Sequence, residues 1–351
     1  SEEFNPEDFY ADDDVVITIS HLGYIKRTPL AEFRAQGRGG VGAKASATRD
    51  GDFVEHIYQG TMHNTMLFFT QKGRCFWQRV YELPEGAKGS KGRAIQNILQ
   101  LEADDNVNAC LCIKNLADAD FCRDHYVVFC TKNGIIKKTC LTEYSRPRAN
   151  GVNAINIVEG DSVIDVCLTD GQSQIILATA NGRAARFNEN TVRAMGRVST
   201  GVRGIQTDDD GNDRCIGMVC VGNPEVETIL ALSDNGFGKR TDAGDYRLCN
   251  RGVKGVIAMR LGEKSGKELI AIKSVTDDDD LMIINKSGTA IRLHMDAIKV
   301  QGRATMGLRV IELRRRNDVI SNVCVVPRSE EEEETEADGN TETQEESNEQ
   351  A

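Results

Sequence analysis

Residues 36–42 read QGRGGVG, and these residue types could bind another molecule through the backbone. The four glycines leave the chain free to take positive φ and allow a partner to lie directly against the main-chain N–H groups. Arg38 places one positive charge among them. The segment is therefore a candidate binding loop. The alternative interpretation is a long surface turn between two strands.

The chain around this loop is built from a repeat of about fifty residues. Six short apolar runs, at 15–19, 65–69, 126–130, 175–179, 228–232 and 281–285, are each followed by a turn glycine, namely Gly23, Gly73, Gly134, Gly182, Gly236 and Gly288. This spacing predicts six β-hairpins. In three copies Asn precedes the glycine, which favours a two-residue type I′ turn.

A second glycine recurs 16 to 19 residues after the first, at Gly39, Gly89, Gly151, Gly201, Gly252 and Gly307. Further strand-like stretches follow it, so that each repeat holds about four strands. Six such units predict an all-β, propeller-like ring of six four-stranded blades, with an open solenoid as the alternative. The final apolar run, residues 319–326, is expected to complete the first blade and close the ring.

The net charge of −11 comes from the two ends of the chain. Residues 1–14 hold seven Asp or Glu and residues 329–351 hold eleven, and neither segment has a Lys or Arg, so residues 15–328 carry a net charge of +7. We expect an acidic linker at 1–14, a basic ring at 15–328 and a disordered acidic tail at 329–351. With no signal peptide, no membrane-length apolar run and no initiator Met, we expect a soluble, cytoplasmic piece of a longer protein.

The eleven cysteines are interpreted as reduced core residues, because they are scattered through apolar runs. A metal site built from Cys110, Cys112, Cys122 and His125 is the alternative, but their spacing matches no established zinc pattern. We predict no metal site and no catalytic residue. The five histidines fall at unrelated positions of the repeat, which argues against a hydrolase site at the centre of the ring.

Positive charge recurs at two fixed positions of the repeat. Four residues after the turn glycine the copies read Arg27, Trp77, Lys138, Arg186, Arg240 and Arg292, and two residues after the second glycine they read Val41, Lys91, Asn153, Arg203, Lys254 and Arg309. A fixed position in a repeat is a fixed place on the ring, so we predict a basic belt around the rim that binds the phosphates of duplex DNA. The alternative is that these charges only solubilise strand ends. The neighbouring Lys26, Arg74, Arg93, Lys137, Lys239 and Lys44 are assigned to the same predicted interface.

The six-fold repeat with QGRGGVG in its first copy resembles the C-terminal domain of the DNA gyrase A subunit, whose box motif typically reads QRRGGKG. Five positions agree with that motif, namely Gln36, Arg38, Gly39, Gly40 and Gly42. Gly37 and Val41 replace an Arg and a Lys. The sequence ADDDVVITISHLGYIKR at the start of the first repeat is also similar to the family, and the resemblance covers residues 15–328.

This resemblance implies a six-bladed β-pinwheel in which residues 36–42 anchor DNA wrapped around the rim, so that the holoenzyme can introduce negative supercoils. The implied partners are double-stranded DNA, the N-terminal catalytic core that precedes this domain, and the gyrase B subunit in an A2B2 complex, at the nucleoid. ATP and Mg would be used by other parts of that enzyme, and no cofactor by this chain. The alternatives are the corresponding domain of topoisomerase IV and a protein-binding propeller scaffold.

Overall fold

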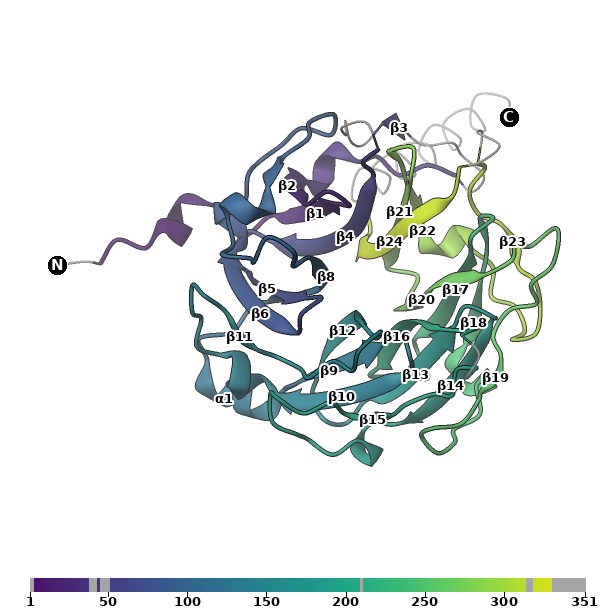
Figure 1. Ribbon diagram of the computed structural model, residues 1–351. Coiled ribbons are helices and arrows are strands. Elements are labelled where there is room, and N and C mark those ends of the chain that lie inside the picture. Colours follow the sequence, from purple (N-terminus) through teal and green to yellow (C-terminus); the bar gives the residue numbers. More distant parts are fainter. Residues whose placement is uncertain (1–2, 38–42, 45–50, 209–210, 314–317, 330–351) are drawn as a thin grey trace, which may run out of the picture.

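The computed structural model of the protein describes residues 3–37, 43–44, 51–208, 211–313 and 318–329. Six four-stranded antiparallel sheets are arranged as blades in a closed ring (Figure 1). The predicted all-β, six-bladed β-pinwheel is confirmed. Apart from Ser329, the predicted tail at 329–351 lies outside the described residues, as do residues 38–42 of the glycine-rich segment.

Each blade runs from an inner strand to a short outer strand, and we number the blades in chain order. Blade one is β4 (Val54–Thr61), β1 (Asp14–Ser20), β2 (Tyr24–Pro29) and β7 (Arg93–Ala94). Blade two is β8 (Val107–Ile113), β5 (Thr65–Thr70), β6 (Arg74–Arg79) and β11 (Val152–Asn153). Blade three is β12 (Val163–Thr169), β9 (Tyr126–Thr131), β10 (Ile135–Cys140) and β15 (Val202–Arg203).

The second half of the ring follows the same order. Blade four is β16 (Cys215–Val221), β13 (Gln174–Thr179), β14 (Arg183–Asn188) and β19 (Val256–Ile257). Blade five is β20 (Leu269–Val275), β17 (Thr228–Ser233), β18 (Phe237–Asp242) and β23 (Leu308–Arg309). Blade six is β24 (Ile320–Pro327), β21 (Asp279–Asn285), β22 (Thr289–His294) and β3 (Ala43–Lys44).

The outer strand of every blade comes from the next repeat along the chain. Blade six has no next repeat, and its outer strand β3 comes from the first one, with Ala43 paired to Ala290 and Lys44 to Thr289. The prediction that residues 319–326 complete the first blade is therefore wrong, because β24 is the inner strand of blade six. The ring closes instead through the strand that directly follows the glycine-rich segment.

The six predicted hairpins are confirmed, but their turns are not type I′. The loop between β9 and β10 has three residues, with Gly134 N–H donating to Thr131 O at 2.9 Å and Gly134 at φ 86°. No non-glycine residue among those described has positive φ, so Asn133 lacks the left-handed conformation that type I′ requires. A type I turn followed by one left-handed glycine explains why the glycine recurs and the asparagine does not.

The structure also corrects the alignment of the second glycine. A left-handed glycine precedes the outer strands of blades one to five, at Gly92, Gly151, Gly201, Gly255 and Gly307. The predicted set had Gly89 and Gly252 in place of Gly92 and Gly255, three residues too early. Measured back from the outer strand, Gly42 is the corresponding glycine of the first repeat in the sequence.

The hydrophobic core consists of six clusters, one at each interface between adjacent blades. Between blades two and three, for example, Phe69 meets Phe129 edge-on with ring centroids 5.0 Å apart. Blade six packs on blade one through a cluster that includes Val16, Leu30, Met282 and Ile284. Because the middle strands have a blade on each face, most of their residues are buried.

Short helices connect the blades. Six 3-10 helices lie between the hairpin and the next outer strand, namely η2 (Leu30–Glu32), η3 (Val80–Glu82), η5 (Leu141–Tyr144), η6 (Glu189–Thr191), η7 (Ala243–Asp245) and η8 (Met295–Ala297). A further 3-10 helix, η4 (Ile95–Asn97), follows β7, and the insertion in the second repeat forms α1 (Ala119–Asp124). No described helix is long and apolar enough to cross a membrane.

The described part of the predicted acidic linker packs against blade two. Helix η1 (Pro6–Phe9) carries Glu7, which accepts a hydrogen bond from Arg79 at 2.5 Å. Tyr10 stacks on Tyr81 with ring centroids 5.3 Å apart. The start of the chain is thus attached to the ring through blade two.

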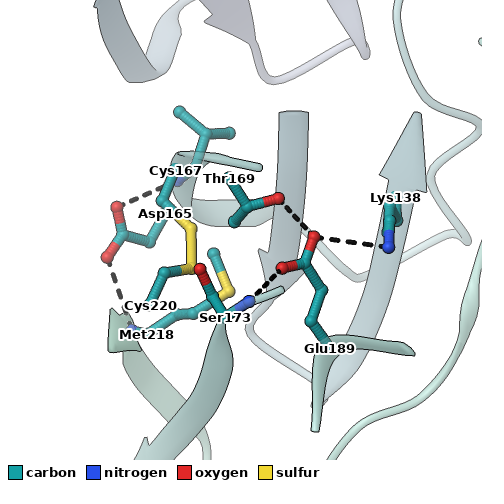
Figure 2. The surroundings of a disulfide bond; sticks show 9 residues. Lys138, Asp165, Cys167, Thr169, Ser173, Glu189, Met218 and Cys220 are labelled. Carbon is teal, nitrogen blue, oxygen red and sulfur yellow. Dashed lines mark hydrogen bonds and ion pairs between the residues drawn. A yellow bond between two sulfur atoms is a disulfide. The ribbon is translucent and has the colours of Figure 1, made fainter. Parts of the chain in front are cut away.

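The prediction that all cysteines are reduced is wrong for one pair. Cys167 on β12 and Cys220 on β16 form a disulfide that joins the inner strands of blades three and four (Figure 2). Nearby, Asp165 accepts a hydrogen bond from Val166 N–H at 2.9 Å, and burial raises the pKa of its carboxyl. The apolar sequence around these cysteines is equally typical of free core thiols, so the pairing could not be predicted.

Candidate nucleic-acid interface

The residue four positions after each turn glycine links its blade to the next repeat. We call these six residues the latch residues: Arg27, Trp77, Lys138, Arg186, Arg240 and Arg292. Four are arginines whose guanidinium groups donate to main-chain carbonyls at the 3-10 helix of the next repeat. Arg292, for example, donates to Phe33 O at 2.9 Å and to Leu30 O at 3.3 Å. Short helices leave carbonyls without intrahelical partners, and these donors satisfy them.

The other two latch residues make the same connection with different chemistry. The indole of Trp77 donates to Tyr144 O at 2.9 Å. Lys138 reaches the carboxylate of Glu189 at 3.3 Å, and Glu189 also accepts hydrogen bonds from Thr169 and Ser173 (Figure 2). Glu189 is fully buried at the first position of η6. Where the repeat has Lys138 in place of an arginine, the buried Glu189 forms an ion pair with it.

These contacts correct the predicted basic belt. Arg27, Lys138, Arg240 and Arg292 are each at most 7% exposed, and Arg186 is half-buried. Three of the assigned neighbours, Lys26, Lys137 and Lys239, are also buried, and burial lowers the pKa of their ammonium groups to about 8, 7 and 8. The middle strands are packed between neighbouring blades, so a cation four residues after the turn glycine is buried or half-buried. Its recurrence marks a blade-to-blade contact.

Exposed positive charge recurs instead on the segments that lead from each 3-10 helix to the outer strand. We call these the rim segments: 34–44, 84–94, 145–153, 193–203, 247–257 and 299–309. Together they contain seventeen Lys or Arg and a single acid, Glu85. In Figure 1 the labelled outer strands β3, β11, β15, β19 and β23 lie at the periphery of the ring. The rim segments of this acidic chain are thus almost purely basic.

The predicted site residues divide accordingly. Five are exposed on rim segments, namely Lys91, Arg93, Arg203, Lys254 and Arg309, and Arg74 is half-buried on β6 with its guanidinium bonded to Asn150 O at 2.6 Å. Gln36 is half-buried and donates its N–H to Arg292 O at 2.7 Å, and Gly37 is exposed. Arg38, Gly39, Gly40, Val41 and Gly42 lie outside the described residues, and Lys44 is described only through its backbone in β3.

Sequence reasoning missed the cation four residues before each rim glycine. With the corrected alignment this position reads Arg38, Lys88, Arg197, Arg251 and Arg303, and the third copy is two residues shorter. The side chains of Arg197, Arg251 and Arg303 donate to Asn153 O at 3.1 Å, Arg203 O at 2.8 Å and Ile257 O at 2.6 Å, each the last residue of the preceding outer strand. The predicted alignment placed the second glycine three residues too early in some copies, so the recurrence of this cation was not recognised. Arg34, Arg146, Arg148, Arg193, Arg247 and Lys299 are further exposed rim cations that were not predicted.

Two of the four residues weighed as alternative metal ligands have other hydrogen-bond partners. Cys122 on α1 donates to Leu116 O at 3.2 Å, and His125 Nδ1 lies 2.7 Å from Phe121 O. Among the described residues, no three His, Cys, Asp or Glu side chains are grouped so as to hold a metal ion.

The opening at the centre of the ring is lined by residues of the inner strands. One of these residues is His56, and burial lowers the pKa of its imidazole.

A closed six-bladed ring with basic rim segments defines a class of propeller-like domains. The sequence profile of "DNA gyrase C-terminal domain, beta-propeller" matches six segments: 14–59, 64–114, 125–166, 173–221, 227–275 and 279–326. These segments cover most of the chain and follow its six repeats. The chain belongs to the DNA gyrase C-terminal domain family.

Relatives and solved structures agree with this assignment. The DNA gyrase A subunit of Salmonella typhimurium is 39% identical over 91% of this chain, and that of Staphylococcus aureus is 38% identical over 97%. The chain spans only 35% and 38% of the length of these relatives. A solved DNA gyrase A C-terminal domain shares the fold, with a TM-score of 0.79 over 89% of this chain and 99% of that one at 23% identity. The C-terminal domain of DNA topoisomerase IV gives 0.66 over 90% and 94% at 26% identity.

Proposed function

We propose that this chain binds and wraps duplex DNA around its rim segments as part of a DNA gyrase. The observation that carries the proposal is the rim composition, seventeen cations against one acid in a chain of net charge −11. Duplex DNA offers a continuous line of phosphates, and cations spread over six blades can follow it. Rim segments are loops and two-residue strands without a helix to place in a major groove, so binding depends on charge and DNA shape.

Wrapping requires the DNA to bend. Bending 20–30 bp by 40–90° costs on the order of 1–6 kcal/mol, which phosphate contacts along the rim must offset. Closing the ring through β3 joins the segment after residues 36–42 to blade six, so the basic edge continues from the last repeat to the first. In the proposed holoenzyme, the B subunit and the catalytic core that precedes this domain supply DNA cleavage, ATP and Mg. We propose the same partners, and a location at the nucleoid, for this chain.

The test measures the linking number of plasmid DNA that is ligated while bound to this chain. Nicked plasmid is ligated with and without the protein at low salt, and the linking number of the product is measured. We expect a shift with the wild type and a much smaller shift when four exposed rim cations, Arg93, Arg193, Lys254 and Lys299, are replaced by Ala. The matched control replaces four exposed lysines outside the rim segments, Lys72, Lys264, Lys267 and Lys286. An unshifted linking number with the wild type would contradict wrapping.

The anchoring role of residues 36–42 is tested in the reassembled enzyme. Replacing Gln36, Arg38 and their neighbours up to Gly42 by Ala is expected to abolish supercoiling while relaxation survives. Equal loss of both activities would indicate a folding defect. The similarity to the topoisomerase IV domain supports a second candidate, and an enzyme that relaxes DNA but never supercoils it, even with the intact chain, would favour that assignment.

A further inference from the structure

A buried lysine lies three residues after the turn glycine in every second blade. These are Lys26 in blade one, Lys137 in blade three and Lys239 in blade five, at 2%, 0% and 0% exposure. Blades two, four and six have Phe76, Ala185 and Ile291 at this position. The repeat therefore has two alternating types, although all six copies share one fold.

Each buried ammonium contacts the rim segment of the next repeat from inside. Lys26 Nζ donates to the carbonyls of Ala87 and Lys88 at 3.0 Å and of Ser90 at 2.8 Å. Lys239 Nζ donates to the equivalent carbonyls of Gly302 at 2.9 Å, Arg303, and Thr305 at 3.0 Å. Lys137 Nζ donates to Arg197 O at 2.9 Å and also to Ala154 O.

The three contacted stretches form the same tight turn, and we call 87–90, 196–199 and 302–305 the anchored turns. The hydroxyl of the last residue donates to the carbonyl of the first, at 2.9 Å for Ser90, 2.6 Å for Ser199 and 2.8 Å for Thr305. Its main-chain N–H donates to the same carbonyl at 3.0 to 3.3 Å. The hydroxyl residues Ser90, Ser199 and Thr305 belong to repeats two, four and six, whereas repeats one and five have Gly40 and Val253 at the equivalent position. The repeats therefore alternate at this position as well.

The direction of the carbonyls fixes the direction of the amides. In a trans peptide the C=O and N–H point to opposite sides, and no described peptide bond is cis. The N–H groups of Lys88, Gly89 and Lys91 therefore point away from Lys26, and those of Arg303, Ala304 and Met306 away from Lys239. Within the part of the chain that the structure describes, these six amides donate to no backbone or side-chain acceptor.

Outward main-chain N–H groups in a turn make a concave site for an anion. Exposed cations flank both turns in the sequence, Lys91 and Arg93 after the first, and Lys299 before and Arg309 after the last. The buried ammonium behind the turn adds a further positive charge and holds the peptides in place. Only one acid, Glu85, lies in these two rim segments.

We propose that the anchored turns are preformed sites for the phosphodiester groups of duplex DNA, placed at every second blade, and that Lys26 and Lys239 act as positioning residues without touching DNA. This inference rests on the proposed function, since it names where along the rim the phosphates are held. The other rim segments then contribute side-chain charge alone.

The experiment uses the full chain with Lys26→Met and Lys239→Met, and with Lys72→Met as a control that removes an exposed charge outside the rim. Affinity for a short linear duplex is measured across a salt series. We expect each buried variant to weaken binding about three- to tenfold, the loss of one hydrogen-bonded contact, and to reduce the slope of log K against log salt by about 0.9. The control should bind like the wild type.

A second readout is independent of how the variants fold. In the wild type with ¹⁵N-labelled glycine and alanine, the amide resonances of Gly89 and Ala304 should shift when the duplex is added, and when sodium sulfate is added more weakly. Unmoved resonances at saturating DNA, or buried variants that bind like the wild type, would overturn the proposal. The variant that lacks Arg93, Arg193, Lys254 and Lys299 is measured in the same assay. If this variant loses affinity while the Lys26→Met and Lys239→Met variants do not, the result contradicts the anchored turns as phosphate sites but still supports DNA binding by the rim segments.

Discussion

The latch residues and the rim segments use the same amino acids for opposite purposes. Arg292 is 5% exposed and donates to three main-chain carbonyls and to Asp280, whereas Arg193 on a rim segment is exposed. Both belong to recurring sets of cations. A Lys or Arg that recurs at one position of the repeat occupies an equivalent position in each blade. Whether that position is buried determines whether the residue joins two blades or is available to bind a ligand.

Removing a latch charge should have the largest effect on stability. Arg292→Met leaves Asp280 buried and removes the donors that join blade six to the first repeat, which should cost about 3–5 kcal/mol of unfolding free energy. Urea denaturation measures this. Arg193→Met is the matched control, expected within about 0.5 kcal/mol of the wild type. Equal losses for the two variants would remove the distinction between latch and rim.

The disulfide should contribute the next largest effect. Cys167 and Cys220 join two blades across a sequence separation of 53. A crosslink of this kind typically stabilises by about 2–4 kcal/mol. We expect Cys167→Ser with Cys220→Ser to lower the free energy of unfolding by this amount and to make it insensitive to reductant. A wild type whose stability is unaffected by reductant, with all eleven thiols alkylated, would contradict the pairing.

A smaller effect is expected from pH. The pKa of Lys26 is about 8 in the folded chain because of burial, against 10.5 for an exposed lysine. Between these values the unfolded chain binds more protons than the folded one, so this group makes stability rise as pH increases from about 8 to 10.5. The difference in unfolding free energy between the wild type and Lys26→Met should therefore change in favour of the wild type over that range. A constant difference would show that the ammonium is not buried.

The smallest expected effect on stability comes from a single rim charge. Arg193→Ala should leave the unfolding free energy within about 0.5 kcal/mol of the wild type. Its effect should appear in DNA binding, where removing one phosphate contact lowers the slope of log K against log salt by about 0.9. A latch variant that remains folded, such as Trp77→Phe, should leave that slope unchanged.

Much of the fold could be predicted because local signals repeat six times. The apolar run and turn glycine of each copy locate the hairpins, and each such glycine has positive φ in the structure, as at Gly23 and Gly288. Ring closure through β3 could not be predicted, because a two-residue strand has almost no sequence signal. The exchange of outer strands between repeats depends on packing across the whole ring.

The candidate site was predicted only in part, for a physical reason. A cation on a middle strand and a cation on a rim segment look alike in sequence, and only the neighbouring blade determines that Lys239 is internal and Lys254 exposed. The anchored turns were missed for the same reason. Their buried lysine is supplied by the preceding repeat, at sequence separations of 61 to 64 for Lys26.

The most direct test of the central claim is the salt dependence of duplex binding by the intact chain. It compares the wild type with the variant that lacks Arg93, Arg193, Lys254 and Lys299. If the rim segments hold the DNA, the slope of log K against log salt should fall by up to about 3.6, at 0.9 per phosphate, while the unfolding free energy stays the same. An unchanged slope in this folded variant would contradict the claim that the rim is the DNA-binding surface.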